Sequence, residues 1–205
     1  DSAKFADLLV ALGGDCVRPV IVTLHTVRRF GHDRLREGLE QPMVFPVVHS
    51  TAMLAAIPDA NLLAHPTPDA IPHEQTQVPA TGVLTLGFLS PGKGLEDNLE
   101  AIAHTDLAYT MAGAILPEYF QYISDRIRDL GIGHRVRIVR EYLTHAQRQQ
   151  LIRDHEVMLL NSETTHDSPP RVSGVAREVL ALRIQSVSSN VPIYDDLVPQ
   201  VSGKF

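Results

Sequence analysis

The strongest chemical feature of the sequence is a glycine-rich turn between an apolar run and a helical segment. The apolar run covers residues 83–88, the turn contains Gly92, Lys93 and Gly94, and the helical pattern covers residues 95–103. In a strand, turn and helix arrangement of this kind, free backbone amides and one lysine can face a phosphate at the start of the helix. An ordinary solvated turn with a surface lysine is the alternative. The spacing of a Walker P-loop is absent.

A second helix start lies near the C-terminus. Ser173 and Gly174 precede a helical segment that contains Glu178. Ser173 predicts an N-cap, and free amides beside it could hold a phosphate. A carboxylate such as that of Glu178 can accept hydrogen bonds from two hydroxyl groups at once. A solvent-facing helix glutamate is the alternative for that residue.

One histidine stands at the end of an apolar run. His25 directly follows residues 20–24. Ligands of open α/β sheets bind beyond the carboxyl ends of the strands, so His25 is a candidate cleft residue. A buried, hydrogen-bonded histidine is the alternative. The other histidines do not have the spacing of metal ligands, so we predict neither a metal site nor another cofactor.

Composition describes an ordinary globular protein. Of the 205 residues, 44% are hydrophobic and 20% are charged, which argues against disorder. The net charge of -6 gives no reason to expect binding to nucleic acid. A single cysteine, Cys16, suits a reducing compartment, and no apolar run is long enough to cross a membrane. We therefore expect a cytoplasmic protein without a transmembrane segment; its oligomeric state stays open.

Short β-branched or apolar runs alternate with segments of helical period, which predicts an α/β fold with parallel sheets. Helical segments are expected at residues 117–130, where Gly131 follows as a stop, and after Thr144, which has the capping-box spacing to Gln147. Strands are expected at residues 20–24, 44–48, 61–64, 83–88, 107–112, 136–139, 157–160 and 185–188.

A proline-rich stretch divides the chain. Residues 65–81 contain four prolines and no apolar periodicity, which is typical of a linker. We therefore predict two lobes, residues 1–75 and residues 76–205. The N-terminal lobe is shorter than a complete domain of the Rossmann type, so it is expected to be incomplete.

Several segments resemble, in order along the chain, the retaining family-four glycosyltransferases, also called glycosyl transferases group 1. The turn at Lys93 resembles the G-x-x-x-x-x-K-G opening of their C-terminal domain, and residues 177–181 resemble their E-A-l-A helix. Further matching segments are residues 19–25, 48–50, 63–68, 130–138, 157–163 and 175–196.

This resemblance implies a fold of the GT-B type, with two Rossmann-like lobes, and transfer of a sugar from a nucleoside diphosphate donor with retention and without a metal. The N-terminal lobe would face the acceptor, which could be a sugar, a glycan or a lipid-linked molecule. The resemblance also implies that Gly92, Lys93, Ser173 and Gly174 hold the diphosphate, that Glu178 binds the ribose, and that His25 lies near the sugar and the acceptor.

The sequence also departs from that family. Arg171 stands where a motif glutamate contacts the transferred sugar, and Phe88 replaces a frequent arginine. Arg183 and Gln185 replace a usual glycine and proline. A non-catalytic subunit that still binds a nucleotide sugar is therefore the first alternative. A different enzyme of the same architecture, such as a nucleotide-sugar epimerase, is the second, because fold does not fix function.

Overall fold

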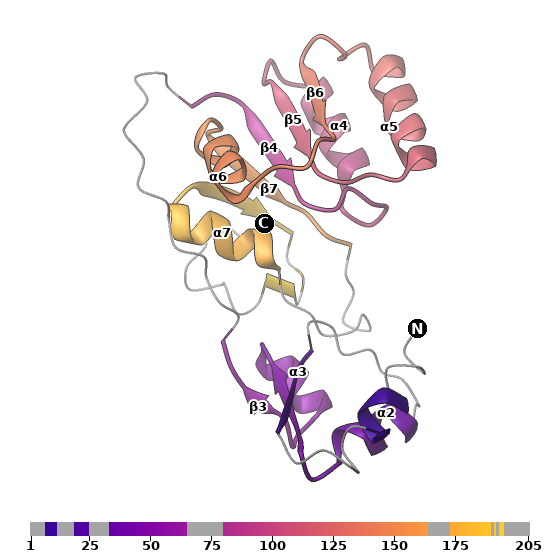
Figure 1. The fold of residues 1–205 in the computed structure, drawn as a ribbon. Coiled ribbons are helices and arrows are strands. Elements are labelled where there is room, and N and C mark those ends of the chain that lie inside the picture. The colour runs from indigo at the N-terminus through magenta and orange to yellow at the C-terminus, as the bar shows by residue number, and fades with distance from the viewer. Residues whose placement is uncertain are drawn as a thin grey trace. The chain divides into compact units, whose positions relative to one another are not determined.

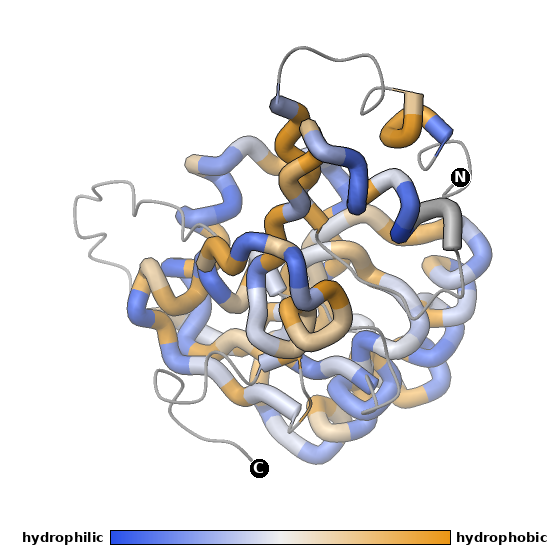
Figure 2. The backbone as a smooth tube through the Cα atoms, turned by 90° about the horizontal axis from the view of Figure 1, so that it is seen from below, coloured by the Kyte–Doolittle hydropathy of each residue, from blue (hydrophilic) through white to orange (hydrophobic). Residues whose placement is uncertain are grey.

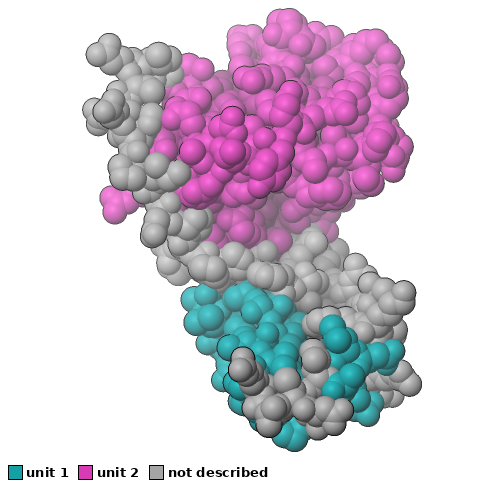
Figure 3. Space-filling model, viewed as in Figure 1, with its two compact units in different colours: residues 1–66, 167–172 teal, residues 67–166, 173–205 magenta. Residues whose placement is uncertain are grey.

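The computed structural model describes residues 7–11, 19–24, 33–64, 80–163, 173–189, 191 and 193–194. The chain divides into two compact units, residues 1–66 with 167–172 and residues 67–166 with 173–205 (Figure 3). Each unit contains its own sheet, so no strand order runs through both. The predicted linker lies outside the described residues except for Ala80 and Thr81. The roles predicted for the two lobes stay predictions.

The N-terminal unit is built on a small parallel sheet with the strand order β1-β2-β3. Its core contains Val22, Val44, Val48 and Met53. Ser50 caps a helix, as its side chain accepts a hydrogen bond from the Met53 amide at 3.2 Å. Its elements are β1 (Val20–Thr23), α2 (Asp33–Leu39), β2 (Val44–Val48), α3 (Thr51–Ala56) and β3 (Asn61–Leu62).

The C-terminal unit contains a five-stranded, wholly parallel sheet with the order β6-β5-β4-β7-β8 (Figure 1). The predicted α/β class is therefore confirmed, and each predicted strand of this unit is present. Its elements are β4 (Val83–Leu86), α4 (Leu95–Ala103), β5 (Tyr109–Ala112), α5 (Pro117–Asp129), β6 (Val136–Val139), α6 (His145–Arg153), β7 (Val157–Leu160), α7 (Gly174–Leu182) and β8 (Gln185–Ser188).

Helices cover both faces of this sheet. Helices α4 and α5 pack with Val83, Tyr109 and Met111, whereas α6 and α7 pack with Leu84 and the other residues that point to the opposite face. Successive strand residues enter the two cores alternately, as the pleat of a strand requires. Helices α4 and α5 bury residues at helical spacing on one face, and Figure 2 shows hydrophobic and hydrophilic stretches following one another along the backbone. Among the described residues, no helix is both long and apolar enough to span a membrane.

The strand order reverses direction between β4 and β7. Connections from β4 run to β5 and β6 on one side, and β7 and β8 lie on the other. Strand β4 pairs with β5 over four residues, but with β7 only at Val83↔Val157 and Leu84↔Met158. The carboxyl-terminal halves of β4 and β7 are therefore not paired. Open α/β sheets bind ligands at such a switch point, so this edge is where a site is expected.

Two glycines let the loops after β4 and β5 approach each other. A Cβ on Gly113 would lie 1.6 Å from the carbonyl oxygen of Gly87, and both residues have positive φ, 143° and 125°. Only glycine accepts such an approach without moving the backbone. Beyond this point, Leu89 and Ile115 form an isolated parallel bridge that keeps the two loops together.

Candidate functional site

The glycine-rich turn lies at the carboxyl end of β4, beside the residues that follow β7. Gly92 and Gly94 have φ values of 81° and 59°, and Lys93 stands between them, half-buried. The Glu163 amide donates to the Gly92 carbonyl at 2.9 Å. A Cβ on Gly94 would lie 2.9 Å from the Asn161 Cβ. The turn is thus held against the end of β7 on both sides of Lys93.

Carboxylates flank this turn. The Glu163 Oε2 atom lies 3.8 Å from the position a Cβ of Gly92 would take. On the first turn of α4, Glu96 accepts a hydrogen bond from the Tyr119 hydroxyl at 2.9 Å. Burial raises the pKa of the Tyr119 phenol, and the charges of Glu96 and Glu163 raise it further, so this hydroxyl stays a donor. Lys93 therefore lies in a turn that has the carboxylates of Glu96 and Glu163 near it.

Beneath the turn, four uncharged polar side chains form a chain of hydrogen bonds. The Asn161 amide donates to Asn98 Oδ1 at 2.5 Å, and the Asn98 amide donates to the Tyr109 hydroxyl at 3.2 Å. Tyr109 in turn donates to Thr85 Oγ1 at 2.8 Å. Asn98, Tyr109 and Thr85 are buried, and burial raises the pKa of Tyr109 to about 12. We call these four residues the amide network.

The amino end of α7 reaches the same edge of the sheet. Ser173 caps this helix, with its hydroxyl accepting from the Ala176 amide at 3.2 Å, as the sequence predicts. A Cβ on Gly87 would lie 3.3 Å from a Val175 methyl, so the first turn of α7 adjoins the residue that follows β4. The amides of Gly174 and Val175, which a helix leaves without partners inside its own first turn, therefore lie near the switch point.

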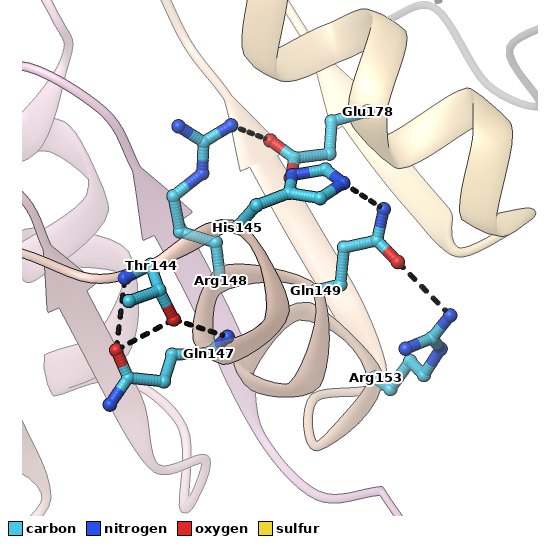
Figure 4. Close-up of polar contacts among 7 residues, drawn as sticks. All are labelled: Thr144, His145, Gln147, Arg148, Gln149, Arg153 and Glu178. Carbon is cyan, nitrogen blue, oxygen red and sulfur yellow. Dashed lines mark hydrogen bonds and ion pairs between the residues drawn. The ribbon is translucent and has the colours of Figure 1, made fainter. Parts of the chain in front are cut away.

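Glu178, one turn further along α7, is completely buried and faces α6. Arg148 donates to its Oε2, and His145 Nδ1 lies 3.5 Å from its Oε1 (Figure 4). Both side chains come from the first turn of α6 and are themselves 41% and 46% exposed. The carboxylate thus lies behind two side chains that solvent reaches. We call Glu178, Arg148 and His145 the ionic cluster.

Hydrogen bonds along α6 fix the tautomer of His145. Arg153 donates to Gln149 Oε1, so the Gln149 nitrogen must donate to His145 Nε2, at 3.0 Å (Figure 4). A neutral His145 then carries its proton on Nδ1, toward Glu178. Even so, Glu178 Oε1 and Arg148 Nε have no hydrogen-bond partner among the described residues. The ionic cluster therefore keeps one acceptor and one donor unused.

Not all of the predicted site residues can be placed. Gly92, Lys93, Ser173 and Gly174 lie at the carboxyl edge of the C-terminal sheet, and Glu178 lies deeper, against α6. His25 and Arg171 lie outside the described residues. The side chain of Phe88 is 55% exposed and supplies no charge. No three histidine, cysteine or acidic side chains of the described part of the chain form a group that could hold a metal ion.

Sequence reasoning did not find Asn98, Asn161 or Arg148. Asn98 had a visible signal, because it falls on the apolar face of its helix between Leu95 and Ile102. Arg148 had none, since an arginine in the first turn of a helix is normally a surface residue.

Solved structures share this architecture. Anabaena HepE in complex with UDP and glucose has a TM-score of 0.78 at 16% identity, over 95% of this chain and 59% of its own. AviGT4, a glycosyltransferase involved in avilamycin A biosynthesis, has a TM-score of 0.58 at 19% sequence identity. The match covers 100% of this chain and 64% of AviGT4. A glycosyltransferase from Rickettsia africae has a TM-score of 0.64 at 14% sequence identity, and the match covers 83% of this chain and 51% of the Rickettsia chain.

The fold is that of the GT-B glycosyltransferases. The resemblance predicted from the sequence is thus confirmed for the fold, while retention stays a prediction. This chain spans about three fifths of the HepE chain. No family model and no curated protein match the sequence. At such low identities, the likeness describes the architecture, and activity has to be argued from the residues of the site.

Proposed function

We propose that this chain is part of a glycosyltransferase that moves a sugar from a nucleoside diphosphate donor to an acceptor, with retention and without a metal ion. The observation that carries the proposal is the Lys93 turn, which lies at the switch point of a GT-B C-terminal unit and is tied to the end of β7. A cation and the free amides of two nearby helix starts suit a diphosphate at that edge.

Catalysis in this proposal consists of stabilising the departing diphosphate. The Lys93 ammonium and the amides near Ser173 and Gly174 would act on charge that develops as the bond to the sugar breaks. His25, in the N-terminal part, would position the sugar or the acceptor. The acceptor is a sugar, a glycan or a lipid-linked molecule. Residues 76–205 would bind the donor and residues 1–75 would face the acceptor.

Glu178 is proposed to accept hydrogen bonds from the ribose. Its Oε1 lacks a hydrogen-bond partner among the described residues, which supports this role. Because Arg148 and His145 cover the carboxylate, one of them has to rotate before a hydroxyl group reaches it. Both are half-exposed side chains, and rotation of His145 would leave the ion pair of Arg148 with Glu178 in place.

A non-catalytic protein that only binds the nucleotide sugar is the second candidate. The sequence favours it at Arg171, which stands where the family has the glutamate that contacts the transferred sugar. Phe88, in place of a cation, points in the same direction. Both candidates would bind the nucleotide sugar at the same site, but only the first would transfer the sugar to an acceptor.

The test is calorimetry with UDP, GDP, ADP and their sugar conjugates, starting with UDP-glucose because HepE has been solved with UDP-glucose. Loss of one charge-assisted hydrogen bond typically costs about 1.5–3 kcal/mol, so Lys93→Ala should weaken nucleotide binding by about 10- to 150-fold. Arg128→Ala is the control, because it removes a cation from α5, where the Arg128 side chain is 69% exposed and pairs with Asp125 and Asp129.

An unchanged affinity in Lys93→Ala would remove the diphosphate assignment. Release of the nucleotide from a bound donor, measured with a panel of sugar and lipid-linked acceptors, then separates the two candidates. Turnover supports the transferase, whereas tight binding without turnover on any acceptor supports the binding protein.

A further inference from the structure

The amide network bridges the part of the sheet where the strands are not paired. Beyond Leu84 and Met158, β4 and β7 have no common register. Asn161 directly follows β7 and reaches Asn98 on α4, which is linked to Tyr109 on β5 and Thr85 on β4. Side chains therefore make the connection between these strands that backbone hydrogen bonds make elsewhere in the sheet.

The same residues hold the glycine-rich turn. The backbone amide of Asn98 donates to the Gly94 carbonyl at 3.0 Å in the first turn of α4, and the Asn161 side chain packs against Gly94. On the other side of Lys93, the amide of Glu163, two residues after Asn161, donates to Gly92. Any movement of Asn161 therefore displaces both ends of the three-residue turn that carries the lysine.

Each bond of the network has a defined direction. Tyr109 has one proton, which goes to Thr85, so its oxygen receives the Asn98 amide. Asn98 then presents its oxygen to Asn161, and the Asn161 nitrogen donates to it. Rotation of either amide by half a turn would place two donors or two acceptors against each other. The network therefore specifies one arrangement and resists alternatives.

We infer that Asn161 and Asn98 are positioning residues for Lys93, and that they set where its ammonium group meets a diphosphate. This inference rests on the proposed function for the ligand. The part that concerns the turn rests on the contacts alone, so the two can be tested separately.

The first experiment uses no ligand. In Asn161→Ala, the Glu163 amide should exchange its hydrogen faster, because the segment after β7 that carries this amide is no longer tied to Asn98 on α4. Amides in the middle of β4 and β5 should keep their protection. The matched control is His155→Ala, which removes a half-buried polar bridge two residues before β7, where Nε2 meets Thr110 Oγ1 at 2.9 Å. It should lower the unfolding temperature without changing Glu163 exchange. Unchanged Glu163 exchange in Asn161→Ala would overturn the inference.

The second experiment is a double-mutant cycle on UDP affinity. Loss of one neutral hydrogen bond suggests that Asn161→Ala weakens UDP binding by about 3- to 10-fold. Combined with Lys93→Ala, the same substitution should change the affinity by less than about twofold, because the lysine through which it acts is gone.

The outcomes of this cycle distinguish the two claims. Additive losses would mean that Asn161 acts on UDP independently of Lys93, and would overturn the positioning role while leaving the site in place. No loss in Lys93→Ala itself would overturn the proposed function, and the exchange measurement would still decide whether the turn is held by Asn161.

Discussion

The C-terminal unit has two clusters of polar side chains near the same edge of its sheet, the uncharged amide network and the charged ionic cluster. The amide network uses uncharged side chains, and at each of its contacts a donor group of one side chain faces an acceptor atom of the next. The ionic cluster uses charges and leaves Glu178 Oε1 and Arg148 Nε without hydrogen bonds among the described residues. Satisfied networks fix a structure, whereas a buried group with unused capacity is costly and often marks a functional site.

The difference suggests a division of work within one site. The amide network connects strands and a turn that a ligand does not need to move. The ionic cluster lies behind half-exposed side chains, where rotation of Arg148 or His145 would uncover a carboxylate. On this division, a substitution in the ionic cluster should change the free energy of unfolding mainly through the charge that it removes. A substitution in the amide network should change it through the lost hydrogen-bond geometry.

The largest effect is expected from removing the cation of the ionic cluster. Arg148→Met leaves a completely buried carboxylate without its main partner, and loss of one member of a buried pair typically costs about 4 kcal/mol of stability. The free energy of unfolding, measured in urea at neutral pH, is the readout. Adding Glu178→Gln should restore most of the loss, because the uncompensated charge disappears.

Arg126→Met provides the control for that measurement. Arg126 pairs with Glu100 between α4 and α5, but both side chains are well exposed, at 39% and 46%. Exposed pairs contribute about 0–1 kcal/mol. Equal losses in Arg126→Met and Arg148→Met would contradict the view that Glu178 is a buried charge held by Arg148.

The next effect concerns Tyr109 at alkaline pH. Its folded pKa of about 12 lies above the ordinary value of 10.0. Below pH 10 both folded and unfolded chains keep the proton. Above pH 10 the unfolded chain loses it first, so stability falls as pH rises toward 12, by up to about 3 kcal/mol. Tyr109→Phe removes this contribution and should show a shallower alkaline decline.

The readout for Tyr109 is the difference between the two pH profiles, since other tyrosines titrate equally in both proteins. The variant starts from a lower stability at neutral pH because it lacks the hydrogen bond to Thr85. Parallel profiles between pH 9 and 12 would mean that the hydroxyl is hydrated in solution, and the amide network would then not be the closed arrangement described above.

The smallest effect is expected at the start of α6, the helix that carries Arg148 and His145. Thr144 accepts a hydrogen bond from the Gln147 amide at 3.3 Å, and the Gln147 side chain accepts from the Thr144 amide at 2.9 Å. Loss of an N-cap typically costs about 1 kcal/mol, so Thr144→Ala should lower the unfolding free energy by that amount. Thr144→Ser should retain nearly all of it. A loss comparable to that of Arg148→Met would show that the cap also supports the ionic cluster.

Local patterns in the sequence predict most of the secondary structure. The expected strands at residues 136–139, 157–160 and 185–188 have the observed bounds, and the Thr144 capping box is present as expected. The strand at residues 107–112 begins later, at Tyr109, because Leu107 and Ala108 are exposed in the turn that follows α4. Short-range chemistry decides these features, so the sequence contains them directly.

Long-range partners could not be predicted in the same way. Arg148 and Glu178 are thirty residues apart, and Asn98 and Asn161 sixty-three, so only the packed sheet brings them together. Arg183 also illustrates a limit. The resemblance identified it as a substitution for glycine, and the structure shows it closing α7 with φ of 56°, a conformation in which glycine costs less. The sequence alone did not reveal that this strain is tolerated.

The close approach of the loops after β4 and β5 has a consequence for how such a protein can evolve. Gly113 approaches the Gly87 carbonyl so closely that no side chain fits, whether or not a ligand is ever bound. Position 93, in contrast, already holds a long side chain, so it does not exclude side chains as position 113 does. A descendant that had abandoned its ligand would therefore be free to replace Lys93 but would have to retain Gly113. The presence of Gly113 in a related chain would then report only that the chain folds, whereas the presence of Lys93 would report selection for binding.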